Sequence, residues 1–282
     1  MLQHEPAIRL GVFLGVLLTL LALERLLPWG HARTLGLRRW PGNIGLAFVG
    51  SLLVRAVAPA AAVGAAVWAE GRGLGLFPAL GLPGWVAIPL SVVLLDLLIY
   101  WQHRLTHAVP LLWRLHRVHH ADPELDATSA LRFHPVEILL SMGLKMAVVV
   151  ALGAPPLGVL AFEVLLNATA MFNHAAIGLP PRLERVLRLG LVTPEMHRTH
   201  HSEVQAETDS CYGFCLPWWD RLFGSYRAAP AAGEAVVIGV LGWRVPALQR
   251  LDRLLLQPLL AAPPLSAAST TASALAPRRS EA

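Results

Sequence analysis

Five stretches of this 282-residue chain are apolar over most of their length and predict helices that can enter a membrane. They span residues 8–23, 43–69, 84–101, 138–153 and 157–173. A helix needs about 20 apolar residues to cross the hydrocarbon core of a bilayer. The last two stretches are shorter than this, and only Ala154, Pro155 and Pro156 separate them. They therefore predict a helical hairpin at about 138–173 whose depth in the membrane the sequence leaves open.

The composition also indicates an integral membrane protein. Hydrophobic residues make up 55% of the chain and charged residues only 15%, whereas soluble domains carry about 25% charged residues. We therefore predict an all-α integral membrane helical bundle. The net charge of +5 comes almost entirely from arginine, since Lys145 is the only lysine. Basic residues beside apolar spans indicate anchoring at the cytoplasmic side rather than nucleic-acid binding. Cys211 and Cys215 are the only cysteines, which excludes a disulfide framework.

The distribution of arginine predicts the orientation of the helices. Residues 24–41 contain four arginines, whereas residues 70–83 contain one arginine and one glutamate. The loop richer in arginine is expected in the cytoplasm. Counting helices from that loop places residues 103–136 and 174–240 on the cytoplasmic side as well. The Ala-, Arg- and Leu-rich composition favours a bacterial inner membrane.

Three regions follow one another along the chain. We expect N-terminal transmembrane helices in residues 1–101, a histidine-rich domain that includes the hairpin in residues 102–240, and an amphipathic segment with a disordered tail in residues 241–282. Residues 245–261 carry leucines at helical spacing, which predicts either a helix along the membrane surface or one packed on the body of the protein. From about residue 263 the chain is rich in Pro, Ala, Ser and Thr, a composition typical of disorder.

Histidine is concentrated in one part of the chain, since ten of the twelve lie between residues 103 and 201. Eight of them form three motifs: His103 with His107, His116 with His119 and His120, and His197 with His200 and His201. On a helix, residues three and four positions apart share a face, so each motif directs its imidazoles to one side. Without a metal, every buried imidazole would need hydrogen-bond partners, and protonated ones would repel each other. The pattern therefore predicts a metal centre.

Eight histidines are too many for one ion with six or fewer ligands, and this favours two ions. A bound metal takes one nitrogen of each ring, and the other N–H then seeks a carboxylate or a carbonyl. Imidazole suits zinc, copper, iron and nickel. Neither triplet contains the glutamate of the zinc motif H-E-x-x-H. A nitrogen-rich two-metal site beside a bilayer favours redox iron that acts on lipid.

The order of the histidine motifs resembles the fatty acid hydroxylase/sterol desaturase superfamily of membrane di-iron enzymes. The blocks that carry the resemblance are DLLIYWQHRLTH, LWRLHRVHH, LRFHPVE, MFNHAAIGLP, TPEMHRTHH and DSCYGFCLPWWDRLFGSY. They cover about residues 90–227, half the chain, and their joint occurrence in this order is specific. One departure is Cys211, where the superfamily often has Asn before Tyr-Gly.

The resemblance implies a di-iron catalytic domain in residues 102–240, with the eight motif histidines as iron ligands and His174 as a further one. No catalytic residue beyond the metal ligands is expected. The resemblance also implies O2 as cosubstrate and a lipid substrate, for example a sterol or a fatty acyl chain, that is hydroxylated or desaturated at an unactivated C–H position. Electrons are expected from a separate cytochrome b5-like or ferredoxin-like protein.

Four further residues are expected to contact the metal-binding histidines on the side of the ring that faces away from the metal. They are Asp96, His134, Asn173 and Asp220. A carboxylate within an apolar run is costly in lipid unless it has a partner, and this applies to Asp96. The plainer alternatives are a packing hydrogen bond for Asp96, an ion pair with Arg221 or Arg227 for Asp220, and a helix-end salt bridge between Glu137 and Arg132.

A His-rich membrane metal transporter is the main alternative function. A transporter would hold its ligands inside the spans, near the midplane of the bilayer. The motif histidines follow or lie between the apolar runs, which favours the enzyme. A protein that keeps the metal only for folding would have the same motifs.

Overall fold

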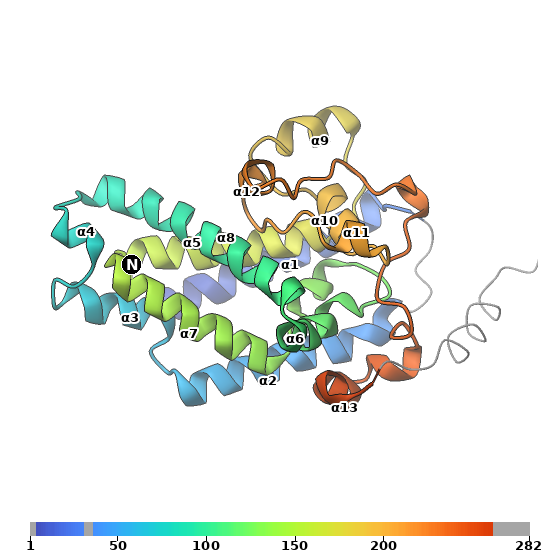
Figure 1. The fold of residues 1–282 in the computed structure, drawn as a ribbon, viewed down its shortest axis with the longest axis horizontal. Coiled ribbons are helices and arrows are strands. Elements are labelled where there is room, and N and C mark those ends of the chain that lie inside the picture. Colours follow the sequence, from blue (N-terminus) through green and yellow to red (C-terminus); the bar gives the residue numbers. More distant parts are fainter. Residues whose placement is uncertain (1–3, 31–35, 262–282) are drawn as a thin grey trace, which may run out of the picture.

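The computed structural model describes residues 4–30 and 36–261, and every regular element within these ranges is helical (Figure 1). Two isolated bridges, Pro28 with Ile177 and Ser202 with Ile238, are the only β-type pairings of the described residues. The predicted all-α fold is therefore confirmed. The tail predicted from residue 263 onward lies outside the described residues.

The five predicted apolar stretches each form a helix that is long and apolar enough to cross a membrane. They are α1 (Glu5–Leu26), the stretch Gly36–Glu70 that holds α2 (Trp40–Val57) and α3 (Ala61–Glu70), α5 (Gly84–Ala108), α7 (Pro135–Leu152) and α8 (Pro156–His174). Pro59 separates α2 from α3, because proline has no N–H for the helical ladder. Pro135 and Pro156 begin α7 and α8, where the missing N–H costs nothing. Gly153 ends α7 in the left-handed conformation, with φ of 64°.

The remaining elements are short. They are α4 (Leu76–Ala79), α6 (Pro110–His120), α9 (Pro181–Leu187), α10 (Pro194–His200), α11 (Gln205–Thr208), α12 (Trp218–Leu222) and α13 (Leu251–Leu256), with 3-10 turns η2 (Gly36–Arg39), η3 (Ala127–Leu131), η4 (Gly233–Ala235), η5 (Pro246–Gln249) and η6 (Gln257–Leu259). Figure 1 shows α4 at one end of the long helices, while α6 and α9 to α13 gather toward the other end.

Helix α8 lies at the centre of the bundle and packs against α1, α3 and α5. Its approach to α5 is close at Gly158, where an added Cβ would lie 2.9 Å from the Cβ of Ser91. Helix α1 packs mainly along α8 and buries only 6% of its apolar window. In a bilayer, the exposed leucines of α1 would contact the lipid chains.

A buried ion-pair network joins the start of α2 to the loop after α6. The guanidinium of Arg39 is fully buried and donates to Asp122 at 2.6 Å and to Asp126 at 2.5 Å. Asn43 donates to Asp122 from the next turn of α2. A buried charge must be paired in this way because removal of one partner leaves the other uncompensated. The network anchors α2 at the end of the bundle where α6 and α10 lie.

The segment 245–261 packs on the body of the protein, which decides between the two predicted arrangements. It forms η5, α13 and η6 in place of one continuous helix, and Leu254 is fully buried. Glycines of α2 make room for it, since an added Cβ on Gly42 would lie 2.5 Å from the carbonyl oxygen of Gln249. Helix α2 therefore covers this segment, through close backbone contact at η5 and through the Leu251 and Leu254 side chains of α13.

Replacement of Gly42 tests this contact. Gly42→Ala is expected to lower the free energy of unfolding by about 1–3 kcal/mol, the usual cost of overpacking. Gly15→Ala in α1, where an added Cβ meets nothing within 4 Å, is the matched control and should leave stability unchanged or raise it slightly. Thermal denaturation of the detergent-solubilised protein measures both. Equal midpoints for the two variants would contradict the packing of η5 on α2.

Candidate metal centre

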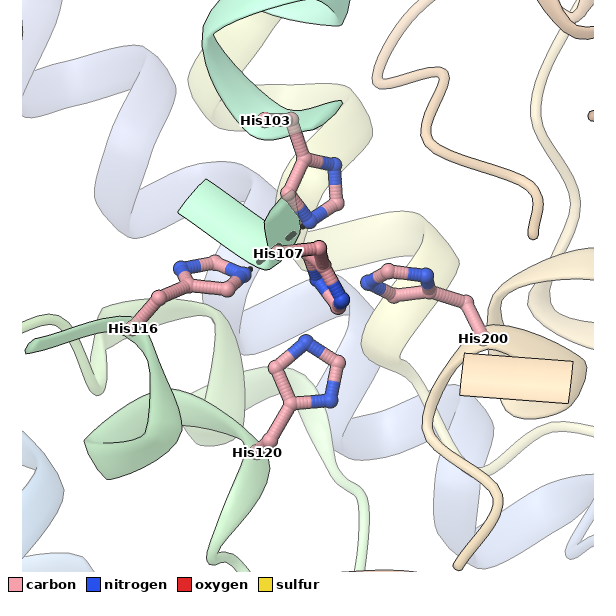
Figure 2. A group of neighbouring side chains, drawn as sticks. All are labelled: His103, His107, His116, His120 and His200. Atoms are coloured by element: carbon pink, nitrogen blue, oxygen red, sulfur yellow. Dashed lines mark hydrogen bonds between the residues drawn. The ribbon is translucent and has the colours of Figure 1, made fainter. Parts of the chain in front are cut away.

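Nine buried imidazoles converge in two groups at the end of the bundle where α5 and α8 finish. The first group is His103, His107, His116, His120 and His200, and the second is His119, His174, His197 and His201. Within each group, the nitrogens that could bind a metal all lie within 4.8 Å of one another. Figure 2 shows the five rings of the first group directed toward a common centre. These are the nine residues that the sequence and its family resemblance single out.

Each H-x-x-H-H triplet is divided between the two groups. His116 and His120 contribute to the first group, whereas His119 contributes to the second. In the later triplet, His200 alone joins the first group. Successive helical residues are rotated by about 100°, so the third and fourth positions after the first histidine diverge to either side of it. Helices α6 and α10 thus each contribute to both groups and join them into one centre.

The hydrogen bonds of the first group leave its inner nitrogens available to bind a cation. Nδ1 of His103 lies 2.8 Å from the carbonyl oxygen of Tyr212, and Nδ1 of His116 lies 2.7 Å from the Glu137 carboxylate. Both oxygens accept, so both Nδ1 atoms carry the proton. The two Nε2 atoms then present lone pairs to each other at 3.0 Å. A metal between such lone pairs removes the repulsion.

The second group has the same arrangement. Nδ1 of His174 donates to the carbonyl oxygen of Ala170 at 2.7 Å, which leaves its Nε2 as an acceptor. That Nε2 lies 3.1 Å from Nε2 of His119 and 3.0 Å from Nε2 of His197. Nε2 of His201 lies 3.1 Å from Nε2 of His197. Four Nε2 atoms therefore converge, and the residues present fit a second ion.

Burial keeps these rings in the form that binds metal. The pKa values of His119, His197 and His201 are lowered well below the ordinary 6.5, first by burial and then by the neighbouring imidazoles. The rings are therefore neutral at pH 7. Neutral imidazole is the form that binds metal ions.

Glu137 contacts a histidine of the first group, which the sequence did not reveal. Instead of a salt bridge with Arg132, its carboxylate accepts from Nδ1 of His116 at 2.7 Å. Arg132 donates instead to the carbonyl of Val118 and to Gln249. The alternative of a salt bridge between Glu137 and Arg132 is therefore wrong, because other acceptors surround the buried guanidinium. The signal that was available is a carboxylate at the start of a long apolar helix.

Two predicted carboxylates hold a loop rather than a histidine. Asp96 accepts from the backbone amides of Cys215 and Leu216, each at 3.1 Å, and from Nε1 of Trp219. Asp220 accepts from the amides of Tyr212 and Gly213 and from the Ser225 hydroxyl, not from an arginine. The direct contacts predicted for these two residues are therefore corrected. The backbone amides of this loop take up both carboxylates as acceptors.

This loop in turn supports the metal centre. Its carbonyl groups at Ser210 and Tyr212 accept from Nδ1 of His200 and of His103, each at 2.8 Å. Cys211 lies between them with φ of 51°. That left-handed conformation is uncommon for residues other than glycine, and Asn adopts it more readily than most.

Asn173 and His134 occupy different places. The Asn173 side-chain oxygen lies 3.1 Å from Nδ1 of His174, and its amide donates to the carbonyl of Phe214. His134 caps α7 by accepting from the amide of Val136. Its Nε2 faces the carbonyl oxygen of Leu255 at 3.2 Å. Both ring nitrogens therefore point away from the two groups, and the predicted role behind the metal centre is not supported by its contacts.

The structure is that of a helical membrane protein with two groups of buried imidazoles, each able to hold a metal ion, at one end of its bundle. Residues 88–225, which contain all nine histidines, match the family model described as Fatty acid hydroxylase. This segment is therefore a fatty acid hydroxylase domain.

The relatives of this chain act on several kinds of lipid-like molecule according to their names. The chain is 31% identical over 157 residues to ornithine lipid hydroxylase OlsE of Rhizobium tropici (55% of this chain, 46% of the relative), 33% over 144 residues to alkylglycerol monooxygenase of Homo sapiens (50% and 30%), and 30% over 169 residues to very-long-chain aldehyde decarbonylase GL1-11 of Oryza sativa subsp. indica (57% and 62%). The chain thus spans less than half the length of the first two relatives. No solved structure matches it significantly.

The Glu137–His116 contact yields a test of the metal centre. Glu137→Gln keeps the shape of the side chain but removes the charge that polarises His116. We expect the affinity for the bound metal to fall by about 10- to 100-fold, as for other carboxylates behind metal-binding histidines. Competition with a chelator measures it. Glu70→Gln, at the exposed end of α3, is the matched control, and equal chelator sensitivity of the two variants would contradict the assignment.

Proposed function

We propose that this protein is a membrane di-iron oxygenase that oxidises an unactivated C–H bond of a lipid, using O2 and electrons from a separate protein. The observation that carries the proposal is a cleft of about 750 Å³ that reaches His103 and His116 of the first group. Its volume falls in the usual range for small-molecule sites. The cleft therefore connects space for a substrate to the candidate metal centre.

The lining of the cleft suits an alkyl chain. Phe13, Ile99, Ile138, Met142 and Phe214 contribute apolar side chains from several elements. These side chains exclude water from the region beside the imidazoles. Position is the main contribution that the protein makes to such a reaction, because a substrate held beside the reactive group reacts much faster than a free one.

The two groups would each hold one ion. His103, His107, His116, His120 and His200 would bind the first iron, and His119, His174, His197 and His201 the second. When bound, a pair of irons would supply the electron transfer to O2 that oxidation of a C–H bond requires. The chain's own residues keep protons on the outer nitrogens, through Glu137 and the carbonyls of Ser210 and Tyr212, so that the inner nitrogens stay free for metal.

Hydroxylation is the favoured outcome. Two of the relatives are named as a hydroxylase and a monooxygenase, and both names describe oxygen insertion into a lipid. Desaturation would use the same imidazoles. We propose that the histidine groups face the cytoplasm, since residues 24–41 are rich in arginine and join helices at this end. A cytochrome b5-like or ferredoxin-like donor would then approach from the cytoplasm of a bacterium.

Metal transport is less compatible with the arrangement. A transporter places its ion site near the middle of the membrane, between broken helices. Here α6 and α10, which lie outside the five candidate spans, supply five of the nine histidines, and His201 directly follows α10. The nine imidazoles therefore gather where the spans end.

Replacement of His119 tests the proposal directly. Wild-type protein is expected to hold about two irons per chain and to convert a membrane lipid to an 18O-labelled alcohol under 18O2. His119→Ala should lose iron from the second group and lose turnover, yet insert normally into the membrane. His4→Ala, an exposed histidine outside both groups, is the control.

Elemental analysis and lipid mass spectrometry provide the two readouts. A product with a new double bond and no label would select desaturation over hydroxylation. Full iron content together with full turnover in His119→Ala would overturn the proposed centre.

A further inference from the structure

The end of the cleft opposite the histidines carries a group of charged side chains. Glu163 of α8 accepts from Lys145 of α7 at 2.7 Å and also from Arg9 of α1. Arg9 pairs with Glu5 on its own helix. Glu163 and Lys145 are buried, and all of these residues line the cleft. Three helices thus bring charge to one place within the apolar bundle.

This charged group lies well away from the metal centre. Lys145 follows Glu137 by eight positions in α7, and Glu163 precedes His174 by eleven positions in α8. At 1.5 Å per helical residue, these separations correspond to about 12 and 16 Å along the helices. Ionisable residues at such depth are costly, and they commonly mark a site of function. An apolar replacement would often be as stable as a buried ion pair, so packing alone does not explain the group.

The charges at this end of the cleft do not balance. Arg9, Arg55 and Lys145 are basic, whereas Glu5 and Glu163 are acidic, which leaves an excess of one positive charge. Arg55 of α2 is exposed and has neither a hydrogen bond nor an ion pair with another described residue. An unpaired guanidinium at the edge of a cleft favours an anionic ligand, since it can donate two hydrogen bonds to a carboxylate or a phosphate.

The cleft also opens sideways. Of its lining residues, Leu10 of α1 and Ser51 and Arg55 of α2 are exposed, as are Pro59 and Ala60 in the turn after α2. Helices α5, α7 and α8 contribute the deeper walls. Both α1 and α2 lie in candidate membrane spans. A molecule dissolved in the bilayer can therefore enter between them without passing through water.

We propose that this end of the cleft binds the anionic headgroup, a carboxylate or phosphate, of a membrane lipid, with Arg55 as its main contact. The alkyl chain of the lipid then runs along the apolar lining toward His103 and His116. This inference rests on the proposed function, because it names the substrate class of the same site. It has one consequence for the reaction: the oxidised carbon is counted from the headgroup and not from the methyl end.

Binding tests the headgroup contact without any turnover. The purified holoprotein in nanodiscs of neutral phosphatidylcholine is titrated with a fluorescent alkyl probe, which is then displaced by hexadecanoate, hexadecyl phosphate or hexadecanol. We expect both anions to displace the probe at lower concentration than the alcohol. Arg55→Gln should reduce this preference by about two- to fivefold, as expected for one exposed ion pair, and Arg55→Glu should abolish it.

Arg72→Gln is the matched control, because Arg72 is exposed but does not line the cleft. It should leave the preference unchanged. A wild-type protein that binds the alcohol as well as the anions, or a preference that Arg55→Gln does not alter, would overturn the inference. The relative potency of hexadecanoate and hexadecyl phosphate decides between the two headgroups.

The site of oxidation provides the second test. Acids of two chain lengths are supplied to the active enzyme, and the labelled carbon is located by mass spectrometry. A constant distance from the headgroup supports the inference, and a constant distance from the methyl end overturns it. Selective anion binding without oxygenation would instead reject the proposed function and leave the headgroup site standing. Oxygenation without a preference for anions would support the proposed function and reject the headgroup site.

Discussion

The arrangement of the helices around the candidate metal centre depends on one constraint, which is that the lone pairs of buried imidazole nitrogens face one another. His103, His116 and His174 each donate from Nδ1 to an oxygen behind them, so each is obliged to turn an unprotonated Nε2 inward. These nitrogens approach their neighbours to about 3 Å. Neutral rings in this arrangement repel each other, and protonated rings would do so more strongly. A cation between these nitrogens would remove the repulsion, and four helices converge to supply its ligands.

Carboxylates in the apolar helices give this centre its support. Asp96 holds the amides of the loop at Cys215 and Leu216, and that loop directs a carbonyl at His103. Glu137 contacts the centre directly, because its carboxylate accepts a hydrogen bond from His116. Glu163 lies farther along the same cleft, where it gathers basic side chains at the end away from the metal centre. The five apolar stretches each contain one charged residue, at Arg9, Arg55, Asp96, Lys145 and Glu163, and all except Asp96 line the cleft.

Much of the helical fold and all nine imidazoles could be predicted before the structure was known. Apolar runs and the spacing of histidines are local signals, and both depend only on the geometry of one helix. The residues behind the centre were harder to predict. Asp96 and Glu137 were each given a plausible partner that proved wrong, because a buried carboxylate binds whichever donor the fold brings near. His134 looked like part of the histidine cluster, yet it caps a helix.

The sequence by itself determined which segments are apolar enough to span a membrane and which histidines share a helical turn. Tertiary structure decided how those turns meet. It sent His119 to one group and His120 to the other, and it reversed the division in the triplet that ends at His201. It also joined Arg9 to Glu163 across 154 positions of the chain. Periodicity reports the direction of a side chain relative to its own helix, whereas a site depends on how separate helices are rotated against each other, and no local pattern records that rotation.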